Sequence, residues 1–242
     1  MTGVQTCALP ISWQRVVGHE GAAARRRVLA ETVVEIEFQV SLLAVRTDGP
    51  KGPVIEFCTP IAHRRAAGVL ESWQPQKMSP AATDAAKSIA ARIVKALGGR
   101  GVFAVDLMIN GDEVYFADVS ARLPQSAWVT LRSQRLSVFE LQARAILGLP
   151  VDTLMISPAA ARAVHRGPET GQASRGGSLS ADALAGALGV PETDLRVFGR
   201  GSARQMGVAV AMAPNVATAR DRARAAATAL SGAPTVGSQR PS

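Results

Sequence analysis

Two aspartates and an arginine have the types and spacing of a site for a metal ion and a phosphate. Asp106 and Asp118 flank a predicted turn, and Arg122 follows closely behind. Two carboxylates on one face of a sheet can hold Mg²⁺ against phosphates, because Mg²⁺ prefers hard oxygen ligands and usually needs only one or two from the protein. A guanidinium suits bidentate contact with phosphate oxygens. The segment therefore indicates a site for a metal-bound phosphorylated ligand.

The positions of these carboxylates depend on a predicted β-hairpin. Asn110-Gly111 lies between two runs of β-branched and aromatic residues, which is a strong hairpin signal. Side chains alternate between the faces of a strand, so the loop length decides whether the carboxylates meet. A loop of three or five residues puts Asp106 and Asp118 on the same face, and a two-residue loop puts them on opposite faces. The alternative is an exposed hairpin with solvated acids.

Other segments of the chain carry a family resemblance. The most specific is Glu71-Ser-Trp-Gln-Pro-Gln, and it is supported by Ala96–Gly99, Ile146–Pro150, Val197–Arg200 and Met206–Ala211. Together they resemble the formate-dependent phosphoribosylglycinamide formyltransferases, ATP-using enzymes of purine synthesis within the ATP-grasp superfamily. The resemblance runs from about residue 28 to about residue 230.

The resemblance implies a nucleotide and metal site. Asp106 and Asp118 take the places of two metal-binding glutamates, and Arg122 would stabilise the charge on the transferring group. Gln39 replaces a glutamate that accepts hydrogen bonds from the ribose hydroxyls, and an amide accepts more weakly than a carboxylate. The adenine contacts would fall on Glu31, Thr32, Val33 and Val34.

The positions implied for the second substrate diverge more from the family. Gln125 stands where an aspartate should meet the substrate amine, so an ionic partner is lost. Arg200 stands for a phosphate-binding lysine and keeps the charge. Arg204 and Gln205 stand for an arginine pair, which halves the charge. Two alternatives therefore stay open: another ATP-grasp carboxylate–amine ligase or carboxylase, and a non-catalytic nucleotide-binding remnant.

The expected fold class is α+β. We expect the second half of an ATP-grasp domain, an antiparallel sheet with flanking helices, followed by a small C-terminal α/β domain. The predicted divisions are a non-native or disordered leader, a partial ATP-grasp domain, the C-terminal domain and a flexible tail, at residues 1–12, 13–150, 151–231 and 232–242. The family's phosphate-covering Gly-rich loop and its N-terminal domain would lie before residue 13.

Periodicity and capping residues predict the individual elements. Strands are expected at 28–34, 36–45, 54–59, 160–165, 195–198 and 207–213. Helices are expected at 13–27, after the N-caps Ser79, Ser180 and Asn215, and after the capping box of Ser137 and Glu140. The Glu71–Gln76 segment, with Trp73, is interpreted as a loop.

Composition limits the classes of function. Hydrophobic content of 47% and charged content of 19% are those of a globular chain. The net charge of +8 comes with no recognised nucleic-acid motif, and no apolar stretch is long enough to span a membrane. Cys7 and Cys58 are too few for a disulfide framework or a zinc site. We expect a cytoplasmic protein that binds neither nucleic acid nor membranes.

The resemblance implies an ATP- and Mg²⁺-dependent formyltransferase that makes N-formylglycinamide ribonucleotide. ATP would phosphorylate formate to formyl phosphate, and the amine of the phosphoribosyl glycinamide would attack the activated carbonyl. A homodimer would be usual for a relative of this family. Whether this chain is active alone is left open.

Overall fold

The structure is a computed structural model that describes residues 33–165, 180–198 and 205–231. The predicted leader, the helix expected at 13–27 and the predicted tail lie outside these ranges. Residues 33–35 belong to a separate unit of the chain, and the fold described below belongs to the unit that begins at Ile36. The strand expected at 28–34 is not seen in its described part, since residues 33 and 34 are irregular.

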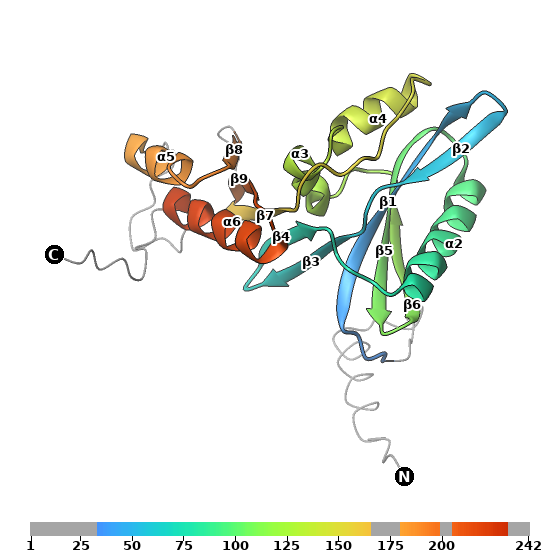
Figure 1. The fold of residues 1–242 in the computed structure, drawn as a ribbon, viewed down its shortest axis with the longest axis horizontal. Helices are drawn as coiled ribbons and strands as arrows, with labels where there is room; N and C mark the ends of the chain where they lie inside the picture. Colours follow the sequence, from blue (N-terminus) through green and yellow to red (C-terminus); the bar gives the residue numbers. More distant parts are fainter. Residues whose placement is uncertain (1–32, 166–179, 199–204, 232–242) are drawn as a thin grey trace, which may run out of the picture. The chain divides into compact units, whose positions relative to one another are not determined.

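One antiparallel sheet runs through this unit (Figure 1). Its order is β6-β5-β1-β3-β4-β7-β9-β8, and β2 pairs with β1 away from this path. The strands are β1 (Phe38–Gly49), β2 (Gly52–Phe57), β3 (Ile61–Ala66), β4 (Val69–Gln74), β5 (Gly101–Asn110), β6 (Glu113–Ser120), β7 (Ala159–His165), β8 (Thr193–Val197) and β9 (Gln205–Met212). The β4–β7 pairing joins the first six strands to the last three in one sheet.

The β3–β4 hairpin corrects one expectation. The sequence predicts a loop around Trp73, but Trp73 lies within β4 and pairs with Ala62 of β3. The strand signal is weak because polar residues occupy both faces of this hairpin. Arg64 pairs with Glu71 on one face, and His63 pairs with Ser72 on the other. Tertiary packing therefore decides the conformation of this segment.

The four helices predicted within the described residues are present, and their caps are as expected. Ser79 accepts a hydrogen bond from the Ala82 amide at the start of α2 (Pro80–Leu97). Ser137 and Glu140 form the capping box of α4 (Val138–Ile146). Ser180 caps α5 (Ala181–Leu188), and the Asn215 side chain accepts from the Thr218 amide at the start of α6 (Val216–Ser231). Two short helices were not predicted: η2 (Gln125–Val129) and α3 (Thr130–Ser133).

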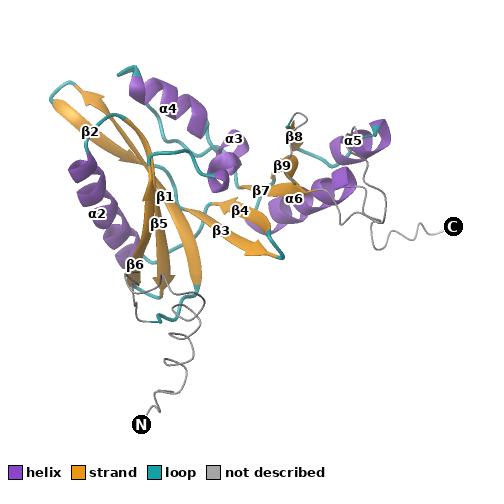
Figure 2. Cartoon of the chain, turned by 180° about the vertical axis from the view of Figure 1, so that it is seen from behind, coloured by secondary structure: helices purple, strands orange, loops and turns teal. Residues whose placement is uncertain are grey.

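Helices cover both faces of the sheet (Figure 2). Val40, Leu42 and Ala44 of β1 belong to a cluster with the apolar side of α2. The alternate residues Leu43 and Val45 belong to a cluster with η2 and α4. Side chains of a strand alternate between faces, so β1 separates two cores. Within the described residues, no helix is long and apolar enough to cross a membrane.

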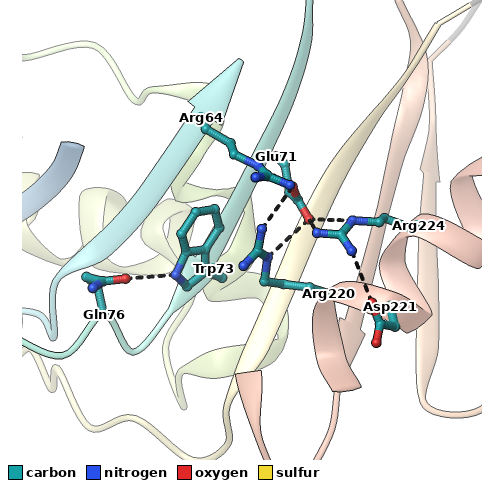
Figure 3. A network of polar contacts seen from close by, with 7 residues as sticks. All are labelled: Arg64, Glu71, Trp73, Gln76, Arg220, Asp221 and Arg224. Carbon is teal, nitrogen blue, oxygen red and sulfur yellow. Dashed lines mark hydrogen bonds and ion pairs between the residues drawn. The ribbon is translucent and has the colours of Figure 1, made fainter. Parts of the chain in front are cut away.

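A buried carboxylate ties α6 to the sheet (Figure 3). The side chain of Glu71 on β4 is 2% exposed and accepts hydrogen bonds from Arg64, Arg220 and Arg224. The guanidinium of Arg220 also lies over the Trp73 ring, 4.0 Å from its centroid. Arg220 and Arg224 belong to α6, whereas Arg64 belongs to β3. We call these four charged residues the Glu71 cluster.

Candidate active site

The β5–β6 hairpin turns on two residues. Asn110 pairs with Glu113, so the loop consists of Gly111 and Asp112. Gly111 has a φ of 57°, a conformation that favours glycine. The loop is therefore shorter than the three or five residues expected to bring the carboxylates together. On a regular hairpin, this loop would place Asp106 and Asp118 on opposite faces.

A β-bulge reverses that outcome. Leu107 pairs with Phe116, whereas the preceding residue Asp106 pairs with Asp118, so Ala117 is an extra residue on β6. A bulge shifts the register of everything beyond it. As a result Asp106 and Asp118 are direct cross-strand partners, whose side chains leave the same face of the sheet. The expectation that a two-residue loop separates them is wrong, because it assumed an unbroken register.

A row of polar side chains crosses this face. Ser41 of β1 pairs with Asp106, which pairs with Asp118, and all three project to one side. In the adjacent row, Gln39 pairs with His63 of β3. Because these residues share a face through the register alone, the sheet itself positions them. Gln39 is exposed on this face, as a ribose contact requires.

The environment of Asp106 favours its charged form. Burial raises the pKa of this carboxyl, but the nearby His63 ring and the hydrogen bond from Ser41 lower it by more, so that the pKa lies below its usual value. Ser41 Oγ donates to Asp106 Oδ1 over 2.6 Å. His63 Nε2 lies 3.8 Å from the same oxygen, which is too long for a hydrogen bond. Asp106 is therefore a half-buried carboxylate whose surroundings favour its charged form.

His63 is one of two residues of this face, with Ser41, that sequence reasoning did not single out. Its Nε2 atom is buried and has no hydrogen-bond partner in the described part of the protein. A buried polar atom without a partner is uncommon in folded proteins. The signal for His63 was hidden because it depends on β3, a strand that was not predicted. Once β3 is known, the pairing with Gln39 places the ring on the face of Asp106.

The other metal and phosphate candidates are more exposed. Asp118 Oδ1 accepts a hydrogen bond from the Val119 amide over 2.8 Å. Arg122 lies just beyond the end of β6, where its amide donates to Ser120 Oγ over 3.0 Å. The Arg122 side chain is exposed, and the geometry assigns it no partner on the Asp106 face within the described residues. Its role at the phosphate therefore stays a prediction.

Of the four substrate candidates, the structure describes Gln125 and Gln205 and brings these two into contact. Gln125 begins η2 and Gln205 begins β9, and Gln125 Nε2 donates to Gln205 Oε1 over 3.1 Å. The two positions therefore meet across 80 residues of sequence. Arg200 and Arg204 lie outside the described residues.

The structure describes two of the four adenine candidates, and these two belong to a different unit of the chain from the metal candidates. Val33 is 94% exposed, and it and Val34 belong to the unit that ends at Glu35. Glu31 and Thr32 lie outside the described residues. The adenine contact therefore remains a prediction.

The donor set of this face fits Mg²⁺. Two carboxylates are opposed on one face, and Asp106 is held in its charged form. In the described ranges, no group of three or more His, Cys, Asp or Glu side chains could hold a metal. A Mg²⁺ ion bound here would therefore take its remaining ligands from phosphates and water, as is usual for this ion.

Two protein families match separate parts of the chain. A family model described as ATP-grasp domain matches residues 9–139, and one described as PurT, C-terminal matches residues 174–230. The formate-dependent phosphoribosylglycinamide formyltransferase of Corynebacterium glutamicum (strain R) is 50% identical over 213 residues, which are 86% of this chain and 51% of that protein.

Solved structures agree with these matches. Glycinamide-RNase-transformylase T from Mycobacterium tuberculosis superposes with a TM-score of 0.73 at 67% identity, over 83% of this chain and 58% of that one. N5-carboxyaminoimidazole ribonucleotide synthetase from Thermus thermophilus has a TM-score of 0.67 at 25% identity, over 85% of this chain and 54% of that one.

The sheet and the family model, which covers more than half of the residues, define the class: the chain belongs to the ATP-grasp family. Within that family its relatives are the formate-dependent phosphoribosylglycinamide formyltransferases, as the resemblance implied. The expected fold class, an ATP-grasp portion with an antiparallel sheet followed by a C-terminal α/β portion, is confirmed. The chain spans about half the length of the curated relatives it matches.

Proposed function

We propose that the full-length protein is an ATP- and Mg²⁺-dependent formyltransferase that converts formate and phosphoribosyl glycinamide to N-formylglycinamide ribonucleotide. The observation that carries the proposal is the 50% identity over 213 residues to a relative named for this activity. The relatives found do not favour the two alternatives, a different ligase or carboxylase and a non-catalytic remnant.

The polar face of the sheet supports the proposal. Asp106 and Asp118 would hold Mg²⁺ against the β- and γ-phosphates of ATP, because their carboxylates are opposed and Asp106 is charged. The bound ion would neutralise charge on the phosphates. Gln39, exposed beside this pair, would accept from the ribose hydroxyls. Val33 and Val34, with Glu31 and Thr32, would meet the adenine edge.

The remaining residues would act on the transferred group and the second substrate. Arg122 would stabilise the charge on the phosphoryl group or on formyl phosphate. Arg200 and Arg204 would hold the ribose 5-phosphate. Gln125 would accept from the substrate amine through Oε1, while its Nε2 donates to Gln205. An amide supplies a weaker partner for an ammonium group than a carboxylate does, so we expect a raised KM for the amine substrate.

Release of ADP by the full-length protein tests the proposal. We expect ADP only when Mg²⁺, formate and phosphoribosyl glycinamide are all present, and no turnover above background for Asp106→Asn. Asp84→Asn, an exposed acid on α2, is the matched control and should keep full activity. Normal turnover by Asp106→Asn would remove the metal site from the proposal.

The substrate assignment is tested by the same assay. ADP release with another amine or with bicarbonate, and none with phosphoribosyl glycinamide, would support a different ligase or carboxylase. Stabilisation by Mg²⁺ and ATP without any ADP release would support the non-catalytic remnant. A cytoplasmic location and a homodimer stay predictions.

A further inference from the structure

The buried hydroxyl of Ser41 contacts the candidate metal ligand Asp106. Ser41 is wholly buried at 0% exposure, although it projects from β1 toward a polar face. Its Oγ is 2.6 Å from Asp106 Oδ1 and 3.0 Å from Ser126 Oγ. A serine in a core strand is otherwise a poor choice, since it adds no apolar area and needs partners. One partner is the candidate metal ligand Asp106, and the other, Ser126, directly follows the candidate substrate residue Gln125.

The direction of the two hydrogen bonds follows from the proton count. Ser41 Oγ donates to Asp106 Oδ1. Because Ser41 has a single hydroxyl proton, its oxygen can only accept from Ser126. Both hydrogen bonds are therefore donated in the same direction, from Ser126 to Ser41 and from Ser41 to Asp106. Hydrogen bonds in such a chain polarise and strengthen one another.

Ser126 connects this chain to the candidate substrate site. It is the second residue of η2 and is 5% exposed. The residue before it is Gln125, which contacts Gln205 of β9. The hydroxyl that supports Asp106 is therefore bonded to the residue directly after Gln125. Ser41 of β1 bonds both Asp106 of β5 and Ser126 of η2. Among the side-chain hydrogen bonds of the described residues, no other residue joins these three elements.

We propose that Ser41 and Ser126 are positioning residues that set the orientation of the Asp106 carboxylate and tie it to the start of η2. The proposal rests on the proposed function, since it assumes that Asp106 binds the metal. Ser41 occupies Asp106 Oδ1 and stops the carboxylate from turning. Oδ2 is then the oxygen presented to the ion. Ser126 acts only through Ser41.

The expected effect follows from the behaviour of residues that orient metal ligands. Removing such a partner typically weakens metal binding about 10–100-fold. We expect Ser41→Ala to weaken binding within that range. Ser126→Ala should weaken it less, because Ser41 still donates to Asp106. In the Ser41→Ala background, Ser126→Ala should add no further loss, because its path to the carboxylate is already broken.

Titration of the full-length protein with Mn²⁺ and ADP, followed by electron paramagnetic resonance, measures this effect without turnover. The variants are Ser41→Ala, Ser41→Thr, Ser126→Ala and the double alanine. Ser41→Thr keeps the hydroxyl and suits a strand, so its dissociation constant should stay close to that of the wild type. Ser88→Ala on the exposed side of α2 is the control. The melting temperature without ligand reports on folding separately.

The outcomes separate this proposal from the proposed function. Tight binding by the wild type with unchanged binding by Ser41→Ala overturns the positioning role and leaves the metal site standing. No Mn²⁺ binding by the wild type overturns both. An independent loss from Ser126→Ala in the double variant contradicts the single path through Ser41. If Ser41→Ala does not fold, Ser126→Ala decides, and binding equal to the wild type overturns the proposal.

Discussion

Glu71 of β4 and Arg224 of α6 are 153 positions apart in the chain, yet Arg224 Nε donates to Glu71 Oε1 over 3.0 Å. Arg220, one turn earlier on α6, donates to the same oxygen over 3.2 Å. The Glu71 cluster thus links the β3–β4 hairpin to the last helix (Figure 3). Since Glu71 lies on the face opposite to Asp106, the cluster acts on the fold and not on the candidate metal site.

Loss of the Glu71 charge should destabilise the fold. Glu71→Gln keeps the shape of the side chain but leaves three guanidinium groups around a neutral amide. Removing one partner of a buried ion pair costs several kcal/mol, and the partial exposure of the arginines reduces this, so we expect a loss of about 2 kcal/mol. Urea denaturation measures it. Glu113→Gln, at an exposed carboxylate on β6, should change the free energy of unfolding by less than about 0.5 kcal/mol.

Ionisation of Glu71 should make the free energy of unfolding depend on pH. Burial raises the pKa of Glu71, but the hydrogen bonds and charges of Arg220, Arg64 and Arg224 lower it by more, so the folded pKa lies below the ordinary 4.5. A lowered folded pKa gives stability that is fully present above the unfolded value and is lost as the pH falls through the folded value. The free energy of unfolding should therefore decrease as the pH is lowered from about 4.5. Denaturation curves for Glu71→Gln should show a shallower fall, and an equal slope would contradict this contribution.

Arg220 should not tolerate replacement by lysine. Its planar guanidinium lies over Trp73 and bonds Glu71 at the same time, which an ammonium group cannot do with equal geometry. We expect Arg220→Lys to lower the free energy of unfolding by about 1 kcal/mol. Arg196→Lys, at an exposed pair with Asp194, is the control and should be near neutral. Equal thermal stability of the two variants would argue against the stacking contribution.

Cys58 should be chemically inert while the protein is folded. Burial raises the pKa of its thiol to about 11, so the reactive thiolate is scarce at pH 8. In a Cys7→Ser background, a thiol reagent should label Cys58 only after urea is added. Labelling of the folded protein at the rate of a free thiol would show that this thiol is accessible.

The Asp118 carboxylate should be needed for metal binding, whereas the bulged residue beside it should not. Deleting Ala117 removes the bulge, but Asp118 then follows Phe116 directly and still pairs with Asp106 on the same face. Mn²⁺ binding should therefore be retained when Ala117 is deleted and lost in Asp118→Asn. Normal binding by Asp118→Asn would mean that Asp118 is not needed, and loss of binding in the deletion variant would contradict the pairing.

Local sequence signals predicted the helices well and the polar hairpin poorly. Ser79 and Ser137 act within a single turn, so their capping roles can be read directly from the sequence. Strands β3 and β4 depend on partners from β1 and β7 that are distant in sequence. Their polar residues are satisfied by one another, as in the pair of Arg64 and Glu71, and no hydrophobic alternation marks them.

The candidate site shows the same limit. Asp106 and Asp118 could be singled out by type and by family resemblance, but their relative placement depends on the bulge at Ala117. No glycine marks that bulge, since β6 reads as a regular strand. Ser41 and His63 could be recognised only once the register of β1 with β3 and β5 was known.

A crystal structure of the full-length protein with Mg²⁺ and a non-hydrolysable ATP analogue tests the central claim most directly. The account predicts one carboxylate oxygen each from Asp106 and Asp118 within about 2.0–2.1 Å of an ion that also contacts the β- and γ-phosphates. It predicts further that the Asp106 oxygen is the one not bonded to Ser41. An ion held by other residues, or an Asp118 side chain turned away from the ion, would contradict it.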